Sequence, residues 1–183
     1  MVSSRVLQGR LVILRPLRRQ DASALDGILR DGRATRFLPA RVRREDGRLF
    51  VTRVLRDRHK GNGFAFAIFE SGTEEAIGQA RLFNWSHPEH TAELGIWLRR
   101  GSWGQGYGTE AIRLLCRYGF RSMSLHRIEA LVVEGNAGSR RALERAGFQL
   151  EGTERRSARL GARWADTWRF GLLRGELIGG DPS

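Results

Sequence analysis

A glycine-rich segment that joins a strand-like run to a long helical pattern constrains this chain more than any other feature. It reads Trp-Gly-Gln-Gly-Tyr-Gly-Thr over residues 103–109, between an apolar run at residues 91–98 and a helical pattern at residues 109–123. Glycine permits positive φ and lets a ligand approach the backbone closely. Unpaired N–H groups at a helix start, with the positive end of the helix dipole behind them, attract phosphate. We therefore expect a phosphate or pyrophosphate group to bind at residues 104–109.

The segment differs from two common nucleotide-binding loops. No Lys-Ser or Lys-Thr pair follows its last glycine, which excludes a P-loop. Thr109 stands where the third glycine of a dinucleotide-binding G-x-G-x-x-G motif would be, and the nearest candidate acid for a ribose, Glu134, comes late. The alternative at this point is a glycine-rich turn that binds no ligand.

Length and composition are those of an ordinary globular protein. We expect the 183 residues to form a single domain at residues 1–183, with an ordered core at about residues 8–176. No apolar stretch approaches the roughly 18 residues that span a bilayer, and the start has no signal-peptide pattern, so we expect a cytoplasmic protein. The single cysteine, Cys116, excludes an intrachain disulfide, and the four histidines show no metal-ligand spacing, so we expect no metal.

The formal net charge of +12 favours anionic partners, such as a phosphate-bearing cofactor or a nucleic acid. The arginines are scattered along the chain rather than collected in one tail. A solvated basic surface without a nucleic-acid partner is therefore the alternative.

Hydrophobic periodicity predicts a mixed α/β fold with about seven strands and four helices. We expect strands at residues 11–15, 64–69, 76–85, 91–98, 127–133, 148–157 and 163–173. We expect one helix after Asp21, a second from Glu45 with a buried stripe, a third at residues 109–123, and a fourth between Asn136 and Gly147. The stripe of the second helix consists of Leu49, Phe50, Val54 and Leu55. The strand at 127–133 should run parallel to the strand at 91–98, because a crossover helix joins them.

Four motifs, in order along nearly the whole chain, resemble the GNAT superfamily of N-acetyltransferases. They are Ala-Glu-Leu-Gly-Ile-Trp-Leu at 92–98, Trp-Gly-Gln-Gly-Tyr-Gly-Thr-Glu-Ala at 103–111, Leu-His-Arg-Ile-Glu-Ala at 125–130, and residues 136–148. More narrowly they resemble its RimJ/RimL branch, bacterial enzymes that acetylate N-terminal α-amino groups of ribosomal proteins. The resemblance implies a GNAT acyl-CoA N-acyltransferase fold whose sheet splays between its fourth and fifth strands. A bulge in the strand at 91–98 would cause the splay.

The resemblance also implies acetyl-CoA as co-substrate, with its pyrophosphate on the loop after Trp103. The pantetheine arm would lie between the strands at 91–98 and 127–133, where it would bond to the main chain of Trp97 and Leu98. The residues implied to contact acetyl-CoA are Trp97, Leu98, Trp103, Gly104, Gln105, Gly106, Tyr107, Gly108, Thr109, Asn136, Ser139 and Arg141. Trp103 occupies a position where the superfamily usually has Arg or Gln.

Two residues are candidates for proton transfer. Strand alternation places Glu93 on the face opposite Leu94, which makes it the candidate base for the amine; a solvent-facing acid is the alternative. Ser139 is the candidate acid for the departing thiolate, although it and Asn136 could serve only as helix cap. Glu144 occupies the position at which many superfamily members have a tyrosine acid.

The expected activity is transfer of an acetyl group to a primary amine, with a protein N-terminus as the leading acceptor, as in a ribosomal protein. The alternatives are an acyltransferase for a polyamine, antibiotic or amino acid, and a catalytically silent module that binds CoA or RNA. The acceptor loops, at roughly residues 31–48, 84–90 and 155–165, do not name the acceptor. Acyl chain length, a homodimer and nucleic-acid contact also stay open.

Overall fold

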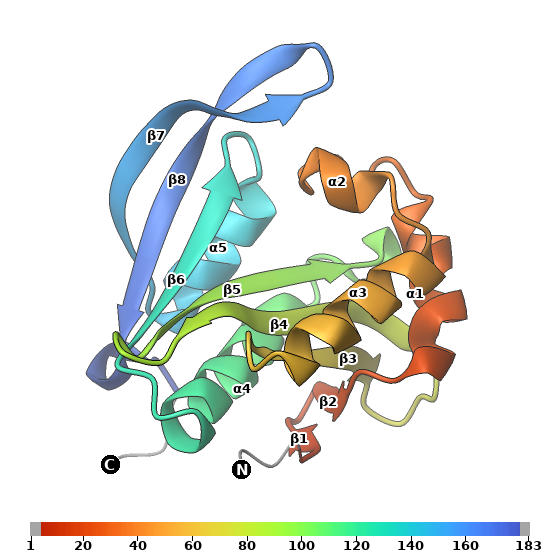
Figure 1. The fold of residues 1–183 in the computed structure, drawn as a ribbon, viewed down its shortest axis with the longest axis horizontal. Helices are drawn as coiled ribbons and strands as arrows, with labels where there is room; N and C mark the ends of the chain where they lie inside the picture. Colours follow the sequence, from red (N-terminus) through yellow and green to blue (C-terminus); the bar gives the residue numbers. More distant parts are fainter. Residues whose placement is uncertain (1–4, 180–183) are drawn as a thin grey trace.

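The computed structural model describes residues 5–179 and shows one mixed sheet in the order β1-β2-β3-β4-β5-β6-β8-β7 (Figure 1). The strands are β1 (Leu7–Gln8), β2 (Val12–Pro16), β3 (Phe64–Glu70), β4 (Ala76–Ser86), β5 (Thr91–Leu98), β6 (Arg127–Val133), β7 (Gln149–Leu160) and β8 (Arg163–Leu173). The α-helices are α1 (Ala22–Leu29), α2 (Ala40–Arg43), α3 (Gly47–His59), α4 (Tyr107–Ser122) and α5 (Ala137–Ala146). The mixed α/β prediction is confirmed. The described chain has one strand and one helix more than expected, because β1 and α2 are too short to show a periodic pattern.

Both faces of the sheet are covered at its central strands, as the nearly all-apolar sequence of β3 requires. Phe66 and Ile68 pack into the core beneath α4 and α5, whereas Ala67 and Phe69 pack into the core beneath α1 and α3. Figure 1 shows α1 and α3 on one side of the central strands and α4 on the other. We call the side covered by α1 and α3 the front face.

The buried face of α3 differs in part from the residues that the sequence predicted. Asp46 is the N-cap, and its carboxylate accepts the N–H of Leu49 at 2.7 Å. A Cβ at Gly47 would lie 2.0 Å from the carbonyl oxygen of Ala22, so Gly47 fixes which side of α3 meets α1. Phe50, Val51 and Val54 are buried at the spacings i+3, i+4 and i+7 from this glycine. Leu49 falls outside that stripe and is 54% exposed, so its predicted burial was wrong.

The parallel pair β5 and β6 is confirmed, and it is short. Only the pairs Thr91–Arg127, Ala92–Ile128 and Glu93–Glu129 connect the two strands. Beyond them β5 stays paired with β4, and β6 stays paired with β8 up to Val133. Figure 1 shows the two strands starting side by side and then pointing in different directions. We call this divergence, bounded by residues 94–98 and 130–133, the β5–β6 fork.

The fork lies where the splay was expected, since the short β1 makes these strands the fifth and sixth. The expected bulge in the strand at 91–98 is wrong. Pairing of β4 with β5 is regular from Gly78 to Phe83 and becomes irregular only between Phe83 and Ser86, where β4 has one extra residue. Asn84 has φ of 51° in this bulge, a left-handed conformation that asparagine tolerates better than most residues.

Candidate functional site

The loop before α4 presents a row of free main-chain donors. Gly104 and Gly106 have φ of 77° and 84°, which explains why glycine is needed at both positions. The N–H groups of residues 104–109 have no hydrogen-bond acceptor in the described part of the chain, and the next one, of Glu110, donates to the carbonyl of Gly106 at 3.1 Å. Gly106 is the N-cap of α4, so the positive end of the helix dipole lies behind these donors. The loop therefore has the unpaired donors and the positive helix end that an anion receptor would need.

The side chains of Trp103, Gln105 and Tyr107 are bound to other parts of the protein and leave the main-chain N–H groups of the loop uncovered. The indole N–H of Trp103 donates to the carbonyl of Leu98 at 3.1 Å, and the amide of Gln105 donates to the carbonyl of Gly101 at 2.9 Å. Tyr107 points into the core, where its hydroxyl donates to Glu70 at 2.5 Å and the pKa of the phenol is raised by that bond. These residues would therefore contact a ligand at residues 104–109 chiefly through the backbone.

The main-chain N–H and C=O groups of β5 point alternately toward β4 and toward the β6 side of the strand. The N–H of Arg99 donates to the carbonyl of Ile77 at 2.8 Å, which makes these residues a hydrogen-bonded pair. Hydrogen-bonded and non-bonded pairs alternate along antiparallel strands, so Trp97 directs its main-chain groups to β4, whereas Ile96 and Leu98 direct theirs toward the fork. The carbonyl of Leu98 is taken by Trp103. The main-chain groups that face the fork thus belong to Ile96 and Leu98 rather than to Trp97, whose ring packs edge-on against Phe50 on the front face.

The start of α5 follows β6 at the open end of the fork. Asn136 caps the helix, as predicted, and accepts the N–H of Ser139 at 3.3 Å. The hydroxyl of Ser139 makes no hydrogen bond within residues 5–179, so it is available to a ligand. Arg140 is bound to Glu144 at 2.8 Å. Arg141, by contrast, is exposed and has no ion pair with a described carboxylate, which leaves it available to a phosphate.

Glu93 lies at the apex of the fork, directly across from Glu129, and the two carboxylates differ in their partners. Glu129 accepts from Arg127 at 2.9 Å and from Arg169 at 3.2 Å. Glu93 forms no ion pair with a described residue and accepts only the side-chain amide of Asn84, at 2.7 Å. Arginines hold both oxygens of Glu129, whereas one oxygen of Glu93 has no partner among the described residues, so the geometry leaves Glu93 rather than Glu129 open to an amine.

Arg81 is the cation next to this apex on the front face. It is paired in register with Gly95, and its guanidinium lies 4.2 Å from the centre of the Phe83 ring. Burial and, after it, the charge of Arg53 together lower the pKa of Arg81 to about 10, and the carboxylate of Glu93 is among the groups that oppose this shift. Sequence reasoning missed Arg81 and also Asn84, whose role depends on a bulge that leaves no periodic signal.

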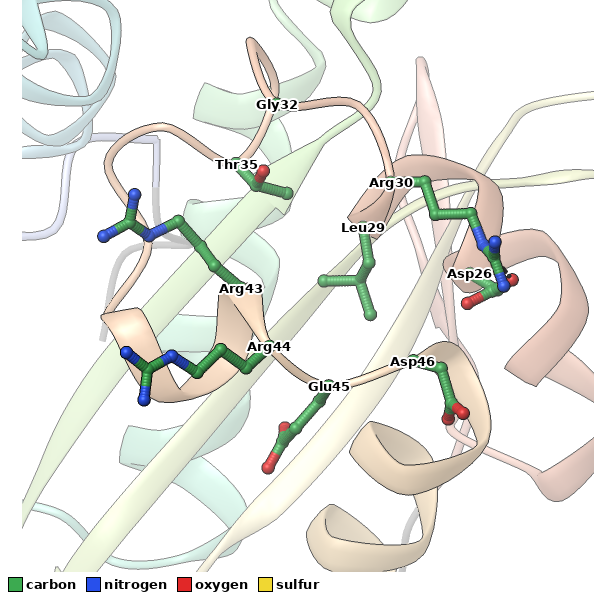
Figure 2. A pocket seen from close by; sticks show the side chains of 9 residues that line it. All are labelled: Asp26, Leu29, Arg30, Gly32, Thr35, Arg43, Arg44, Glu45 and Asp46. Carbon is green, nitrogen blue, oxygen red and sulfur yellow. Dashed lines mark hydrogen bonds and ion pairs between the residues drawn. The ribbon is translucent and has the colours of Figure 1, made fainter. Parts of the chain in front are cut away.

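A second feature of the described chain involves other residues. A hollow of about 360 Å³ opens between α1 and the junction of α2 with α3, where Figure 2 shows Arg43 and Arg44 on one side and Asp26 and Arg30 on the other. It contains none of the predicted site residues. Within residues 5–179 no cluster of three or more His, Cys, Asp or Glu side chains is arranged to hold a metal, and no helix is long and apolar enough to cross a membrane.

Comparison with known proteins agrees with this geometry. Residues 11–149 match the model of the acetyltransferase (GNAT) domain family. The chain is 33% identical to the probable N-acetyltransferase YjcK of Bacillus subtilis (strain 168), over 92% of this chain and 97% of that protein. It is 30% identical to the [ribosomal protein uS5]-alanine N-acetyltransferase of Escherichia coli (strain K12), over 62% of this chain and 59% of the relative.

Among solved structures, Mycobacterium smegmatis RimJ in complex with CoA-disulfide superposes with a TM-score of 0.82. The sequence identity is 27%, and the superposition covers 96% of this chain and 88% of that chain. The family match spans most of the chain and includes β5, the glycine loop, α4 and β6. The protein therefore belongs to the GNAT family of acetyltransferases.

Proposed function

We propose that this protein transfers the acetyl group of acetyl-CoA to the α-amino group of a protein N-terminus. Membership of the GNAT family and the CoA-bound RimJ relative support acetyl-CoA as the donor. The uS5-alanine N-acetyltransferase relative supports a protein N-terminus as the acceptor. The observation that carries the proposal is the β5–β6 fork, which ends beside six consecutive N–H groups, at residues 104–109, that have no acceptor among residues 5–179.

The fork and the loop suit the two ends of one extended ligand. The pyrophosphate of acetyl-CoA would accept hydrogen bonds from residues 104–109, and Arg141 would add a positive charge at the start of α5. The amides of the pantetheine arm would pair with the main chain of Ile96 and Leu98 as a short additional strand. From Leu98 back to Glu93 is five residues, or ~17 Å of strand, so the arm would direct the thioester toward the apex of the fork.

Glu93 would act as the base there. An α-amino group has a pKa of about 8, so it loses a proton to a carboxylate or to an intervening water far more readily than a lysine does. Asn84 would hold the Glu93 carboxylate in position from the bulge. The hydroxyl of Ser139 would donate a proton to the departing thiolate and regain one from solvent water. No tyrosine is available for this role, because Tyr107 and Tyr118 are both buried in the core.

The test separates donor binding from chemistry. Glu93→Gln should leave CoA affinity unchanged and lower turnover about 100-fold or more, while Glu74→Gln, an exposed carboxylate elsewhere, should change neither. If Ser139→Ala weakens CoA binding more than it slows turnover, Ser139 is a binding residue and not the acid. Wild-type turnover in Glu93→Gln would remove that residue from the mechanism.

The acceptor is tested with one panel of acetyl-CoA consumption assays. N-terminal peptides, spermidine, an aminoglycoside and free amino acids are offered in parallel, and products are identified by mass spectrometry. We expect acetylation of the peptide α-amine. Acetylation confined to spermidine or the aminoglycoside would contradict the proposed acceptor while leaving the acetyltransferase activity intact.

A further inference from the structure

The positive charge of this protein is concentrated on two segments. Residues 33–44 and 155–164 contain nine arginines and no acidic residue, so they carry +9 of the formal net charge of +12. We call these nine side chains the arginine rim; they are Arg33, Arg36, Arg41, Arg43, Arg44, Arg155, Arg156, Arg159 and Arg163. Although arginine is distributed along the whole sequence, these two segments therefore hold a strong local excess of positive charge.

The fold brings the two segments together. Residues 33–44 run from the end of α1 through α2, and residues 155–164 form the tip of the β7–β8 hairpin. Figure 1 shows α2 facing that tip, and Arg43 donates from its guanidinium to the carbonyl of Arg159 at 3.4 Å. The segment also reaches the end of β6, because the ring of Phe37 lies 3.8 Å from where a Cβ on Gly135 would be. The rim therefore lies over the open end of the fork.

The rim is poorly neutralised by the protein itself. Eight of its side chains are exposed, and only Arg41 has an ion pair with a described carboxylate, Glu45 at 3.7 Å. Two of the neighbouring acids are engaged elsewhere: Asp166 accepts the main-chain N–H of Arg156, and Glu154 pairs with Arg169. The Nε of Arg43 is buried without a hydrogen-bond partner within residues 5–179. An anionic partner would supply the missing counter-charge.

We propose that the rim selects acceptors whose N-terminal amine is followed by a run of acidic residues. This inference rests on the proposed function, since it needs an acceptor whose amine reaches Glu93. A peptide satisfies both requirements, because its amine can enter at the apex while the residues that follow lie across the rim. The same charge repels polyamines and aminoglycosides.

The geometry also sets where the acidic residues should stand. Gly171 of β8 is in register with Glu129, which is in register with Glu93. From Gly171 to Asp166, beside Arg156, is five residues or ~17 Å of strand, and from Gly171 to Arg163 is eight residues or ~27 Å. An extended acceptor advances ~3.4 Å per residue from its amine at position 1, so its acidic residues should fall at about positions 6–9.

The experiment compares decapeptides that share residues 1–5 and residue 10. Residues 6–9 are Asp/Glu, Asn/Gln or Lys/Arg, and a fourth peptide carries its acids at positions 2 and 3 only. Release of CoA from acetyl-CoA by the full chain gives kcat/KM at low and high salt. We expect the first peptide to exceed the neutral one about tenfold at low salt, with the advantage shrinking at high salt as the charges are screened. The basic peptide should be the poorest.

Two variants with the same change of charge locate the effect. Arg155→Gln with Arg163→Gln should remove most of the acidic advantage and leave the neutral peptide unchanged. Arg19→Gln with Arg145→Gln, two exposed arginines outside the rim, should leave the advantage intact. An equal loss in both variants would overturn the proposal, as would equal rates for acidic and neutral peptides or a preference for acids at positions 2 and 3.

Two further outcomes separate this inference from the proposed function. Acetylation of the neutral peptide without a preference for acidic peptides would refute the proposed role of the arginine rim and leave the proposed function intact. Acetylation of no peptide would refute both proposals. A fluorescein-labelled RNA 12-mer is titrated in parallel. Rim-dependent binding of this RNA, with no acidic preference among the peptides, would assign the surface to nucleic acid instead.

Discussion

Replacing Gly106 by alanine tests whether the loop conformation carries ligand binding. Gly106 has φ of 84°, and a Cβ there would lie 3.4 Å from a terminal methyl of Leu11. An L-residue in the left-handed region costs about 1–2 kcal/mol. Gly108 is the matched control, because it lies inside α4, has no positive φ, and its Cβ would meet only a methyl of Leu98 at 3.7 Å. Gly108→Ala should stabilise the protein by up to about 1 kcal/mol, the difference in helix propensity.

The strain in Gly106→Ala can be expressed in two ways. If the loop keeps its conformation, the free energy of unfolding falls by about 1–2 kcal/mol, which lowers Tm by roughly 2–8 °C for a domain of this size. If the loop relaxes, CoA must restore it on binding, and the same energy raises Kd about 5- to 30-fold. The losses of stability and of binding free energy should therefore total about 1–2 kcal/mol.

Thermal unfolding and calorimetric titration with CoA measure the two quantities on the same samples. We expect a combined loss in Gly106→Ala and none in Gly108→Ala. Wild-type Tm together with wild-type CoA affinity in Gly106→Ala would refute the assignment of the loop. A larger loss of affinity in Gly108→Ala than in Gly106→Ala would refute it as well.

Three further predictions concern Glu110, Cys116 and the two tyrosines. Glu110 accepts the N–H groups of Arg10, Leu11 and Val12 at 3.1, 2.7 and 2.8 Å, so Glu110→Ala should cost about 3 kcal/mol in chemical denaturation, and a loss below about 1 kcal/mol would contradict that role. Burial raises the pKa of the Cys116 thiol, so a thiol reagent should label it only after unfolding; stoichiometric labelling of the native protein would show that α4 opens. Burial raises the pKa of Tyr118 to about 12 and the bond to Glu70 raises that of Tyr107, whereas unfolded tyrosine ionises near pH 10. The folded state therefore holds these protons more tightly, and stability should fall as pH rises from about 10 to 12, with absorbance at 295 nm rising only as the protein unfolds.

Regular elements with a strong local pattern could be predicted closely. The strands at 127–133 and 163–173 have the bounds expected from sequence, because their apolar alternation is bounded by polar turns. The glycine loop was recognisable because the positive φ that its backbone adopts at residues 104 and 106 favours glycine, and glycine is visible at both positions in the sequence. Asn136 and Gly147 were recognisable for the same reason, since helix caps are local signals, and both occupy the cap positions.

Features that depend on distant partners could not be predicted. Glu110 looks like an ordinary acidic residue in the first turn of a helix. Its carboxylate nevertheless accepts N–H groups from residues that lie 98 to 100 positions earlier in the chain. The bulge was placed on the wrong strand, because one extra residue in β4 changes no hydrophobic period, and the link from Asn84 to Glu93 was missed with it. The arginine rim was invisible because its two segments lie more than 100 residues apart and meet only in the fold.

Amide hydrogen exchange resolved by NMR, with and without CoA, tests most directly whether the β5–β6 fork and the glycine loop hold the donor. Without ligand, the amides of Ile96, Leu98 and residues 104–109 should exchange quickly, because they have no acceptor among the described residues, while β6 amides bonded to β8 should be protected. Saturating CoA should slow exchange at Ile96, at Leu98 and along 104–109. Unchanged exchange at these amides, with new protection elsewhere on the protein, would contradict the account.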